Sequence, residues 1–255
     1  MASGPYWNED VMIANSEMPH ILAVGDSWFW YPLNNLLNPV FNLWNGHYVI
    51  LALGGNGYNA GDLVKPPVRQ QFADCLDDYS RSIKVILISG GGNDIAGMED
   101  FLAIIKPDCS AAKRYRACFR PGQPKRMLDA IAGAYRELIA VARAKVPDAV
   151  IVTHNYDHAI PSGAGFLGFG HWLKDPMDQA RVPHAFRQPV VNALIDGLGA
   201  RLAGFAKRYQ NVVWVKTTGT LARRDWANEL HPHPGGFEKI VKRCFKPVLA
   251  KYLKW

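Results

Sequence analysis

A serine follows directly after a short apolar run near the N-terminus, in the sequence Gly25, Asp26, Ser27. The run HILAVG over residues 20–25 is typical of a buried strand, so Ser27 is expected in a tight turn between a strand and a helix. In such a turn the hydroxyl is exposed and the backbone N–H groups point outward, which suits a nucleophile. A simple turn or a helix N-cap is the alternative interpretation of these residues taken alone.

Two glycine-rich segments follow two further apolar runs. Residues 54–59 come after residues 48–53, and residues 90–94 come after residues 83–89. Glycines allow the backbone to approach a ligand closely and leave N–H donors free. In the second segment they bring Asn93 to the end of a strand, where its amide can donate to a developing oxyanion. Taken singly, each segment is equally well explained as a glycine-rich turn.

The fourth feature is His231, which precedes the last predicted helix. A histidine on the loop after a fifth strand can reach across the sheet edge to the serine and act as a general base. The alternatives are a helix cap and a metal pair with His233. A metal site is not favoured, because no cysteine or carboxylate stands at ligand spacing from this pair.

Together the four features resemble the SGNH (GDSL-type) hydrolases, a family named for a serine, a glycine, an asparagine and a histidine in separate sequence blocks. The matching residues are Gly25, Asp26, Ser27 and Trp28, then Gly55 to Gly57, then Gly91, Gly92, Asn93 and Asp94, and last His231. The blocks stand in the family's order over about residues 20–240. The resemblance implies a serine hydrolase that cleaves carboxylic esters, as an esterase, a lipase-like enzyme or a deacetylase, through a seryl acyl-enzyme.

The resemblance also implies a role for each matching residue. Ser27 attacks the carbonyl carbon, and His231 takes and returns the proton. The oxyanion hole consists of the Ser27 N–H, a glycine N–H and the Asn93 amide. Counted from the strand, Gly57 fits the glycine position better than Gly55, which is expected to contact the substrate. No metal and no organic cofactor is implied.

The position three residues before His231 departs from the family, which has an aspartate where this chain has Asn228. An aspartate fixes the imidazole tautomer and stabilises the imidazolium, whereas an amide oxygen accepts the Nδ1 hydrogen without a full charge. In a serine protease the Asp-to-Asn change lowers turnover about 10⁴-fold, yet cysteine proteases work with Cys, His and Asn. Three possibilities stay open for the group that orients His231: Asn228 is a neutral orienting residue, Asp225 or Glu229 supplies a carboxylate, or a backbone carbonyl accepts from His231.

Aromatic residues are expected to line the substrate cleft. Trp28 and Trp30 follow the nucleophile, and at least one of them should reach the site, although packing beneath the sheet is the alternative for both. The Gly-, Pro- and aromatic-rich stretch 156–189 follows a strand end and should overhang the site. Phe166 and Trp172 in that stretch would form the other wall of an apolar cleft for an acyl chain or an aromatic ester.

The elements that must position these residues alternate between short apolar runs and longer helical patterns. Strands are predicted at residues 20–25, 48–53, 83–89, 148–154 and 211–215, and helices at 124–146, 188–209 and 237–253, the last interrupted by Pro247. This alternation predicts an α/β fold, a three-layer α/β/α sandwich with a five-stranded parallel sheet. The resemblance adds a flavodoxin-like strand order, 2-1-3-4-5. Such sheets bind their ligands beyond the carboxyl ends of the strands.

Length and composition are consistent with this fold. A chain of 255 residues that is 49% hydrophobic can bury the core of one α/β domain. We therefore expect a single domain over residues 1–255, with insertions at about 106–123 and 156–189. Collagen-like and disordered classes are excluded, and the longest apolar runs fall far short of the roughly 20 residues of a transmembrane helix.

The N-terminal stretch 1–19 lacks the charged and apolar regions of a secretory signal. This predicts a cytoplasmic protein if the chain is complete and a secreted one if it is already trimmed. The four cysteines do not decide between these locations, and a bridge between Cys109 and Cys118 stays open. The number of subunits is likewise not predicted.

The net charge of +7 is concentrated in two stretches, residues 113–126 and 239–254. Both are interpreted first as solvated faces, so a nucleic-acid partner is not favoured. An anionic membrane surface would suit the amphipathic C-terminal stretch, but the last helix of an α/β domain needs the same apolar face against the sheet. The expected partner is a small-molecule or acylated substrate. A catalytically silent binding protein of the same fold and an acyltransferase that uses the same site are the alternative functions.

Overall fold

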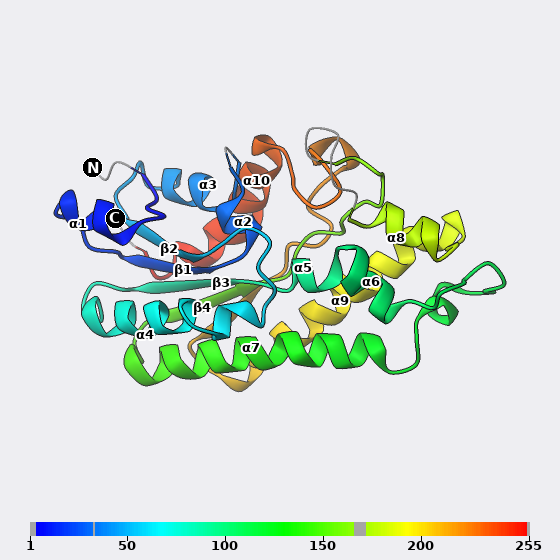
Figure 1. The fold of residues 1–255 in the computed structure, drawn as a ribbon. Coiled ribbons are helices and arrows are strands. Elements are labelled where there is room, and N and C mark those ends of the chain that lie inside the picture. The colour runs from blue at the N-terminus through cyan, green and yellow to red at the C-terminus, as the bar shows by residue number, and fades with distance from the viewer. Residues whose placement is uncertain (1–3, 33, 166–171, 254–255) are drawn as a thin grey trace.

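The computed structural model describes residues 4–32, 34–165 and 172–253. Five strands form one parallel sheet in the order β2-β1-β3-β4-β5 (Figure 1). The strands are β1 (Ile21–Gly25), β2 (Ile50–Gly54), β3 (Val85–Ser89), β4 (Val150–His154) and β5 (Val212–Val215). The predicted strands and their order are confirmed, and each strand begins one or two residues later than predicted.

The three strands β1, β2 and β3 end level with one another. Gly25, the last residue of β1, pairs with Gly54 of β2 on one side and with Ser89 of β3 on the other. Every residue of β1, β3 and β4 is buried, as expected for a parallel sheet that is covered on both faces. The loops after β1, β2 and β3 therefore leave the sheet side by side at the carboxyl ends of the strands.

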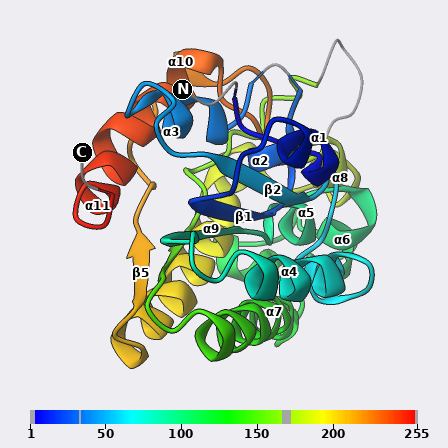
Figure 2. The same cartoon turned by 90° about the vertical axis from the view of Figure 1, so that its left-hand side faces the viewer.

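Helices cover both faces of the sheet (Figures 1 and 2). One face carries α4 (Val68–Asp78), α7 (Gln123–Lys145) and α9 (His184–Arg208), and the other carries α3 (Leu37–Asn42), α10 (Pro234–Ile240) and α11 (Lys246–Leu249). The shorter helices are α1 (Glu9–Ala14), α2 (Ser27–Trp30), α5 (Gly92–Ile95), α6 (Met98–Ile104) and α8 (Lys174–Gln179). Figure 1 shows α5, α6 and α8 beyond the carboxyl ends of the strands. No helix in the described ranges is long and apolar enough to cross a membrane.

Two sequence-based boundaries need correction. The stretch 156–189, predicted as an insertion that ends where the next helix begins, contains α8 and the first residues of α9. Pro189 lies inside α9, where tertiary packing overrides its tendency to end a helix. The last predicted helix is divided by a π-helical turn at Val241–Phe245, after which α11 carries Pro247 in its first turn, where a missing N–H costs little.

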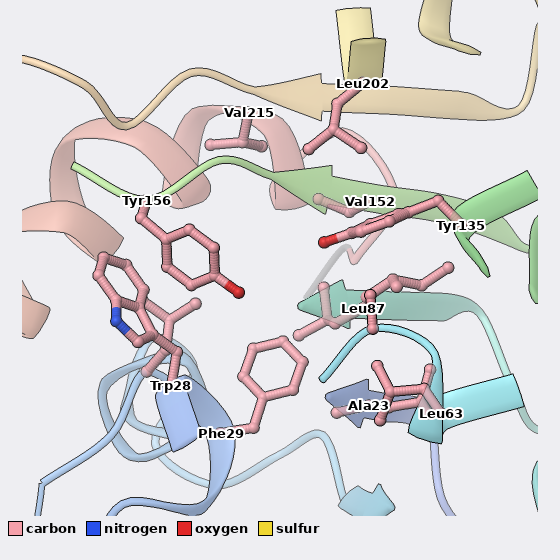
Figure 3. Packing of buried hydrophobic residues seen from close by; sticks show 14 of the residues in the cluster. Ala23, Trp28, Phe29, Leu63, Leu87, Tyr135, Val152, Tyr156, Leu202 and Val215 are labelled. Atoms are coloured by element: carbon pink, nitrogen blue, oxygen red, sulfur yellow. The ribbon is translucent and has the colours of Figure 1, made fainter. Parts of the chain in front are cut away.

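Aromatic side chains fill the core at the carboxyl end of the sheet. Figure 3 shows Trp28 and Phe29 of α2 close to Tyr156, which follows β4. The Trp28 and Tyr156 rings meet edge to face with centroids 5.0 Å apart, and all three side chains are buried. Because α2 is anchored by these rings, the backbone of its first residue, Ser27, is held firmly at the sheet edge.

Candidate active site

The turn that carries Ser27 is built around a buried carboxylate. Asp26 caps α2 by accepting from the Trp28 N–H at 3.1 Å, and it also accepts from the hydroxyls of Ser89 at 3.0 Å and Tyr156 at 2.5 Å. Burial raises the pKa of Asp26 above its ordinary value. The cap makes Ser27 the first residue of α2, and within the described residues its backbone N–H has no acceptor.

His231 lies against this serine although 204 residues separate them in sequence. Its Nε2 is 2.8 Å from the Ser27 Oγ. Burial lowers the pKa of His231 to about 4, so the imidazole is neutral at pH 7. A neutral imidazole hydrogen-bonded to a hydroxyl is the arrangement that a general base requires.

Asn228 determines which nitrogen of His231 carries the proton. Its Oδ1 lies 2.9 Å from the Leu230 N–H and 2.8 Å from the His231 N–H, and only the amide oxygen can accept from both. The same Oδ1 is 3.2 Å from His231 Nδ1. Nδ1 is therefore the protonated nitrogen, and the Nε2 lone pair faces Ser27. Of the open possibilities, the neutral orienting residue is the one that this geometry matches.

The two carboxylates considered as orienting residues are engaged elsewhere. Asp225 pairs with Lys239 Nζ at 2.6 Å and accepts from the Ala222 N–H at 2.7 Å. Glu229 is fully buried and accepts backbone N–H bonds from Gly163 and from residues 172–174. The structure brings neither carboxylate to His231, because the turn over residues 228–231 is closed by the Asn228 side chain instead.

This arrangement predicts unequal effects of two substitutions. Asn228→Ala removes the acceptor of Nδ1 and of two backbone N–H groups, so kcat should fall by about 10- to 100-fold. Asp225→Asn weakens an ion pair with Lys239 that does not include His231, so kcat should stay within about threefold of the parent. Steady-state hydrolysis of an activated ester measures both. A larger loss in Asp225→Asn than in Asn228→Ala would contradict the assignment of Asn228.

The residues expected to hold an oxyanion come from the loops after β1, β2 and β3. Asn93 lines the same pocket as Ser27, and its Nδ2 donates one hydrogen to the Tyr58 carbonyl at 2.9 Å, which leaves the second hydrogen for a ligand. The Gly55 N–H is used, because it donates to the Gly25 carbonyl at 3.2 Å. The Gly57 N–H has no acceptor in the described parts of the chain, and Gly57 has φ +77°. Gly57 is therefore the better donor of the two glycines.

Asp94 connects the second and third loops. Its carboxylate accepts from the Ala60 N–H at 2.8 Å, and burial raises its pKa to about 6. Gly91, which has φ +103°, turns the chain so that Asn93 and Asp94 face the second loop; an added Cβ there would lie 2.9 Å from Ile131. The glycines of the third loop thus bring both polar side chains to the sheet edge.

A narrow apolar pocket opens beside Ser27. Its cavity volume is only about 30 Å³. The pocket is lined by Asp26, Ser27, Trp28, Gly92, Asn93, Ile95, Ala96, Tyr156, Asp157, Ala159, Leu173, Val191, Ile195, Trp226 and Leu230. An apolar slot of this kind accommodates a small acyl group better than a bulky one.

Of the aromatic residues expected at the substrate cleft, Trp28 lines the pocket, while its indole N–H donates to the Leu230 carbonyl at 3.1 Å. Trp30 faces a separate groove with Trp7, and its indole N–H donates to the Leu53 carbonyl. Trp172 presents its ring edge-on to His231 with centroids 6.2 Å apart. Phe166 lies outside the described residues.

Within residues 4–32, 34–165 and 172–253, no three His, Cys, Asp or Glu side chains are grouped as metal ligands would be. In the same ranges the four cysteines, Cys109 and Cys118 included, are free thiols.

Sequence reasoning did not identify Tyr31, which the structure places on His231. The two rings stack with centroids 3.9 Å apart and planes inclined by 7°. Tyr31 follows Trp28 and Trp30, for which only a place in the cleft or packing beneath the sheet was predicted. Its position directly after the helix that carries Ser27 is the one signal that could have indicated a role at the base.

Comparisons with known proteins agree with the fold. A model of the GDSL-like lipase/acylhydrolase family matches residues 22–239, and the chain belongs to this family. Its matched range holds Ser27, Asn93 and His231. The family and the fold define a hydrolase of the ester-cleaving SGNH class. No curated protein matches the chain in sequence.

Solved structures share the fold at low sequence identity. An extracellular lipase from Streptomyces rimosus is 15% identical with a TM-score of 0.56, over 92% of this chain and 100% of that one. A phospholipase A1 from Streptomyces albidoflavus NA297 is 15% identical with a TM-score of 0.54, over 91% and 98%. A family 3 carbohydrate esterase from Clostridium thermocellum is 16% identical with a TM-score of 0.50, over 92% and 95%. These likenesses show the fold alone.

Proposed function

We propose that the protein hydrolyses carboxylic esters of small acyl groups through an acyl-enzyme on Ser27. The observation that carries the proposal is the 2.8 Å contact between Ser27 Oγ and the Nε2 of a neutral His231 whose Nδ1 is held by Asn228. A serine, a base and a group that orients the base form the minimal arrangement for nucleophilic acyl transfer.

In the first half-reaction the Ser27 Oγ forms a bond to the carbonyl carbon while its proton moves to His231 Nε2. The electron pair of the carbonyl π bond moves to the oxygen, where the N–H groups of Ser27 and Gly57 and the Asn93 amide are the proposed donors. The tetrahedral intermediate then expels the alcohol, which takes the proton from His231. In the second half-reaction water attacks the carbonyl carbon of the acyl-enzyme while its proton moves to His231. The second tetrahedral intermediate then expels the Ser27 oxygen, which takes the proton from His231, and the carboxylic acid is released.

The apolar pocket beside Ser27 supports the choice of a small acyl group. The volume of this cavity is only about 30 Å³. A long chain would have to displace Leu173, Ile195 or Leu230, all of which line the pocket. We therefore propose acetyl to butyryl esters as the best substrates, with a deacetylase as the narrowest form of this activity.

The test is hydrolysis of p-nitrophenyl esters from acetate to decanoate by the purified protein, with Ser27→Ala as the background. The proposal expects turnover that is highest for the shortest esters and absent in Ser27→Ala. Mass spectrometry should also find one fluorophosphonate adduct, on Ser27. No adduct on Ser27 and no turnover above background across the series would overturn the proposal and favour a silent binding protein.

The pH profile gives a second check of the proposed base. Burial lowers the pKa of His231 to about 4, so its imidazole stays neutral at lower pH than a free histidine does. We therefore expect kcat/KM to stay constant from pH 8 to about pH 4, where His231 takes up a proton, and not to fall near pH 6.5. The profile is measured between pH 3.5 and 8 with circular dichroism to confirm folding.

Asp94 titrates within the same range, because burial raises its pKa to about 6. Asp94→Asn therefore serves as the control variant and should keep the acid limb of kcat/KM near pH 4. An acid limb that stays near pH 6.5 in the parent, with the protein folded, would show that His231 is not the buried neutral base proposed here.

A further inference from the structure

The ring of Tyr31 covers one face of His231. The two rings are nearly parallel, inclined by 7°, with centroids 3.9 Å apart. His231 is buried, and its other described aromatic neighbour, Trp172, meets it edge-on at 6.2 Å. A parallel stack at van der Waals distance restricts tilting of the imidazole toward that face.

Tyr31 also contacts the other two members of the site. Its hydroxyl lies 3.1 Å from Asn228 Nδ2, which donates to it, so the amide oxygen is kept facing His231 Nδ1. Its backbone N–H donates to the Ser27 carbonyl at 2.6 Å, because Tyr31 is the C-cap of α2. One residue therefore touches the nucleophile, the base and the group that orients the base.

We propose that Tyr31 is a positioning residue that replaces part of the work of the missing aspartate. Its ring stabilises the imidazolium that forms when His231 takes the Ser27 proton, and its hydroxyl fixes the orientation of the Asn228 amide. This inference rests on the proposed function, since it concerns the charge that develops on His231 during acyl transfer.

The physical reason lies in the charge of the groups around the base. Among the described residues, the side chains that hydrogen-bond to the His231 ring or pair with it as aromatic rings are Ser27, Tyr31, Asn228 and Trp172, and all four are neutral. The imidazolium forms in a buried place without a carboxylate partner, and the negative face of an aromatic ring is the remaining group that attracts a cation. The parallel stack presents that face to the whole imidazolium.

The test compares Tyr31→Phe and Tyr31→Leu in the parent and in an Asn228→Asp background. In the parent, Tyr31→Leu should lower kcat about 10- to 30-fold with KM nearly unchanged, because the lost attraction acts on the charged state of His231. Tyr31→Phe keeps the ring and should lower kcat only about two- to tenfold through the lost hydrogen bond.

In the Asn228→Asp background a full carboxylate faces Nδ1, so Tyr31→Leu should lower kcat less than about threefold. A merely structural tyrosine would give the same loss in both backgrounds, and that result would overturn the proposal. Unchanged kcat in Tyr31→Leu of the parent would overturn it as well. Tyr209→Leu is the matched control: it removes a ring that stacks on Phe205 next to the amino end of β5, and it should leave kcat unchanged.

Two readouts separate this inference from the proposed function. The rate of fluorophosphonate labelling of Ser27 needs an activated serine but no particular ester, and it should fall in Tyr31→Leu by the same factor as kcat. The ¹⁵N chemical shifts of the His231 ring report its tautomer without any reaction, and the Nδ1-protonated form should lose population in Tyr31→Leu. If the parent hydrolyses no ester while both readouts change, the proposed substrate fails and the role of Tyr31 stands. If neither changes, the role of Tyr31 fails.

Discussion

Ser27→Ala and His231→Ala are each expected to lower kcat/KM for a short activated ester by about 10³- to 10⁴-fold, and the double variant by no more than either single one. Without the serine there is no acyl-enzyme, and without the imidazole at 2.8 Å no group takes its proton. The two side chains take part in the same step, so removing the second side chain causes no further loss in kcat/KM. Burst and steady-state kinetics on p-nitrophenyl acetate measure all three variants.

The controls are a serine and a histidine on the exposed surface. Ser80→Ala and His184→Ala should keep kcat/KM within about twofold of the parent, because substitutions at exposed positions away from the site have small effects. A double variant whose loss equals the product of the two single losses would show that Ser27 and His231 act independently. That result would contradict an acyl-enzyme formed by general-base catalysis.

The fold was predictable because its signals are local. Short runs of β-branched and aliphatic residues, each followed by glycine or a polar turn, indicate buried parallel strands without reference to distant residues. The strand order came from the family resemblance, since periodicity carries no information about which strands are neighbours. The start of α9 was missed because Pro189 suggests a break, whereas packing of α9 against α7 and β5 maintains the helix.

The site was predictable only where a residue stands at the end of a strand. Ser27, Asn93 and His231 follow strands or precede a helix in recognisable motifs, so their positions could be placed on the sheet edge from sequence. Tyr31 and Glu229 act through partners far away in sequence: Tyr31 meets Asn228 across 197 residues, and Glu229 meets Gly163 across 66. No local pattern encodes such contacts, and a carboxylate beside His231 in sequence suggested a catalytic role that the structure does not give it.

Glu229 instead ties Gly163 to residues 172–174 through backbone N–H groups. Its Oε1 accepts from the N–H groups of Gly163 at 2.9 Å and Lys174 at 3.0 Å, and its Oε2 accepts from those of Trp172 at 2.7 Å and Leu173 at 2.8 Å. Its own N–H donates to the Ala164 carbonyl at 3.0 Å. The carboxylate is fully buried, so these N–H groups supply the hydrogen bonds that water would otherwise donate to it.

Glu229→Gln should therefore destabilise the protein strongly although the two side chains have the same shape. The amide NH₂ faces backbone N–H donors where a carboxylate oxygen had accepted from two of them, and each buried donor without an acceptor costs about 1 to 3 kcal/mol. We expect a loss of about 3 to 5 kcal/mol in the free energy of unfolding, and a fall in Tm of about 10 °C for a chain of this size. Urea denaturation followed by circular dichroism measures the first quantity, and calorimetry the second.

The matched control is Glu137→Gln, which removes the charge of a half-exposed glutamate that pairs with Arg69. Exposed ion pairs contribute little, so this variant should lose less than about 1 kcal/mol. Because Glu229 also fixes Trp172, whose ring edge faces His231, the folded fraction of Glu229→Gln should have a lower kcat/KM than the parent at a temperature well below its Tm. Equal stability losses in the two variants would mean that the buried carboxylate does not tie Gly163 to residues 172–174.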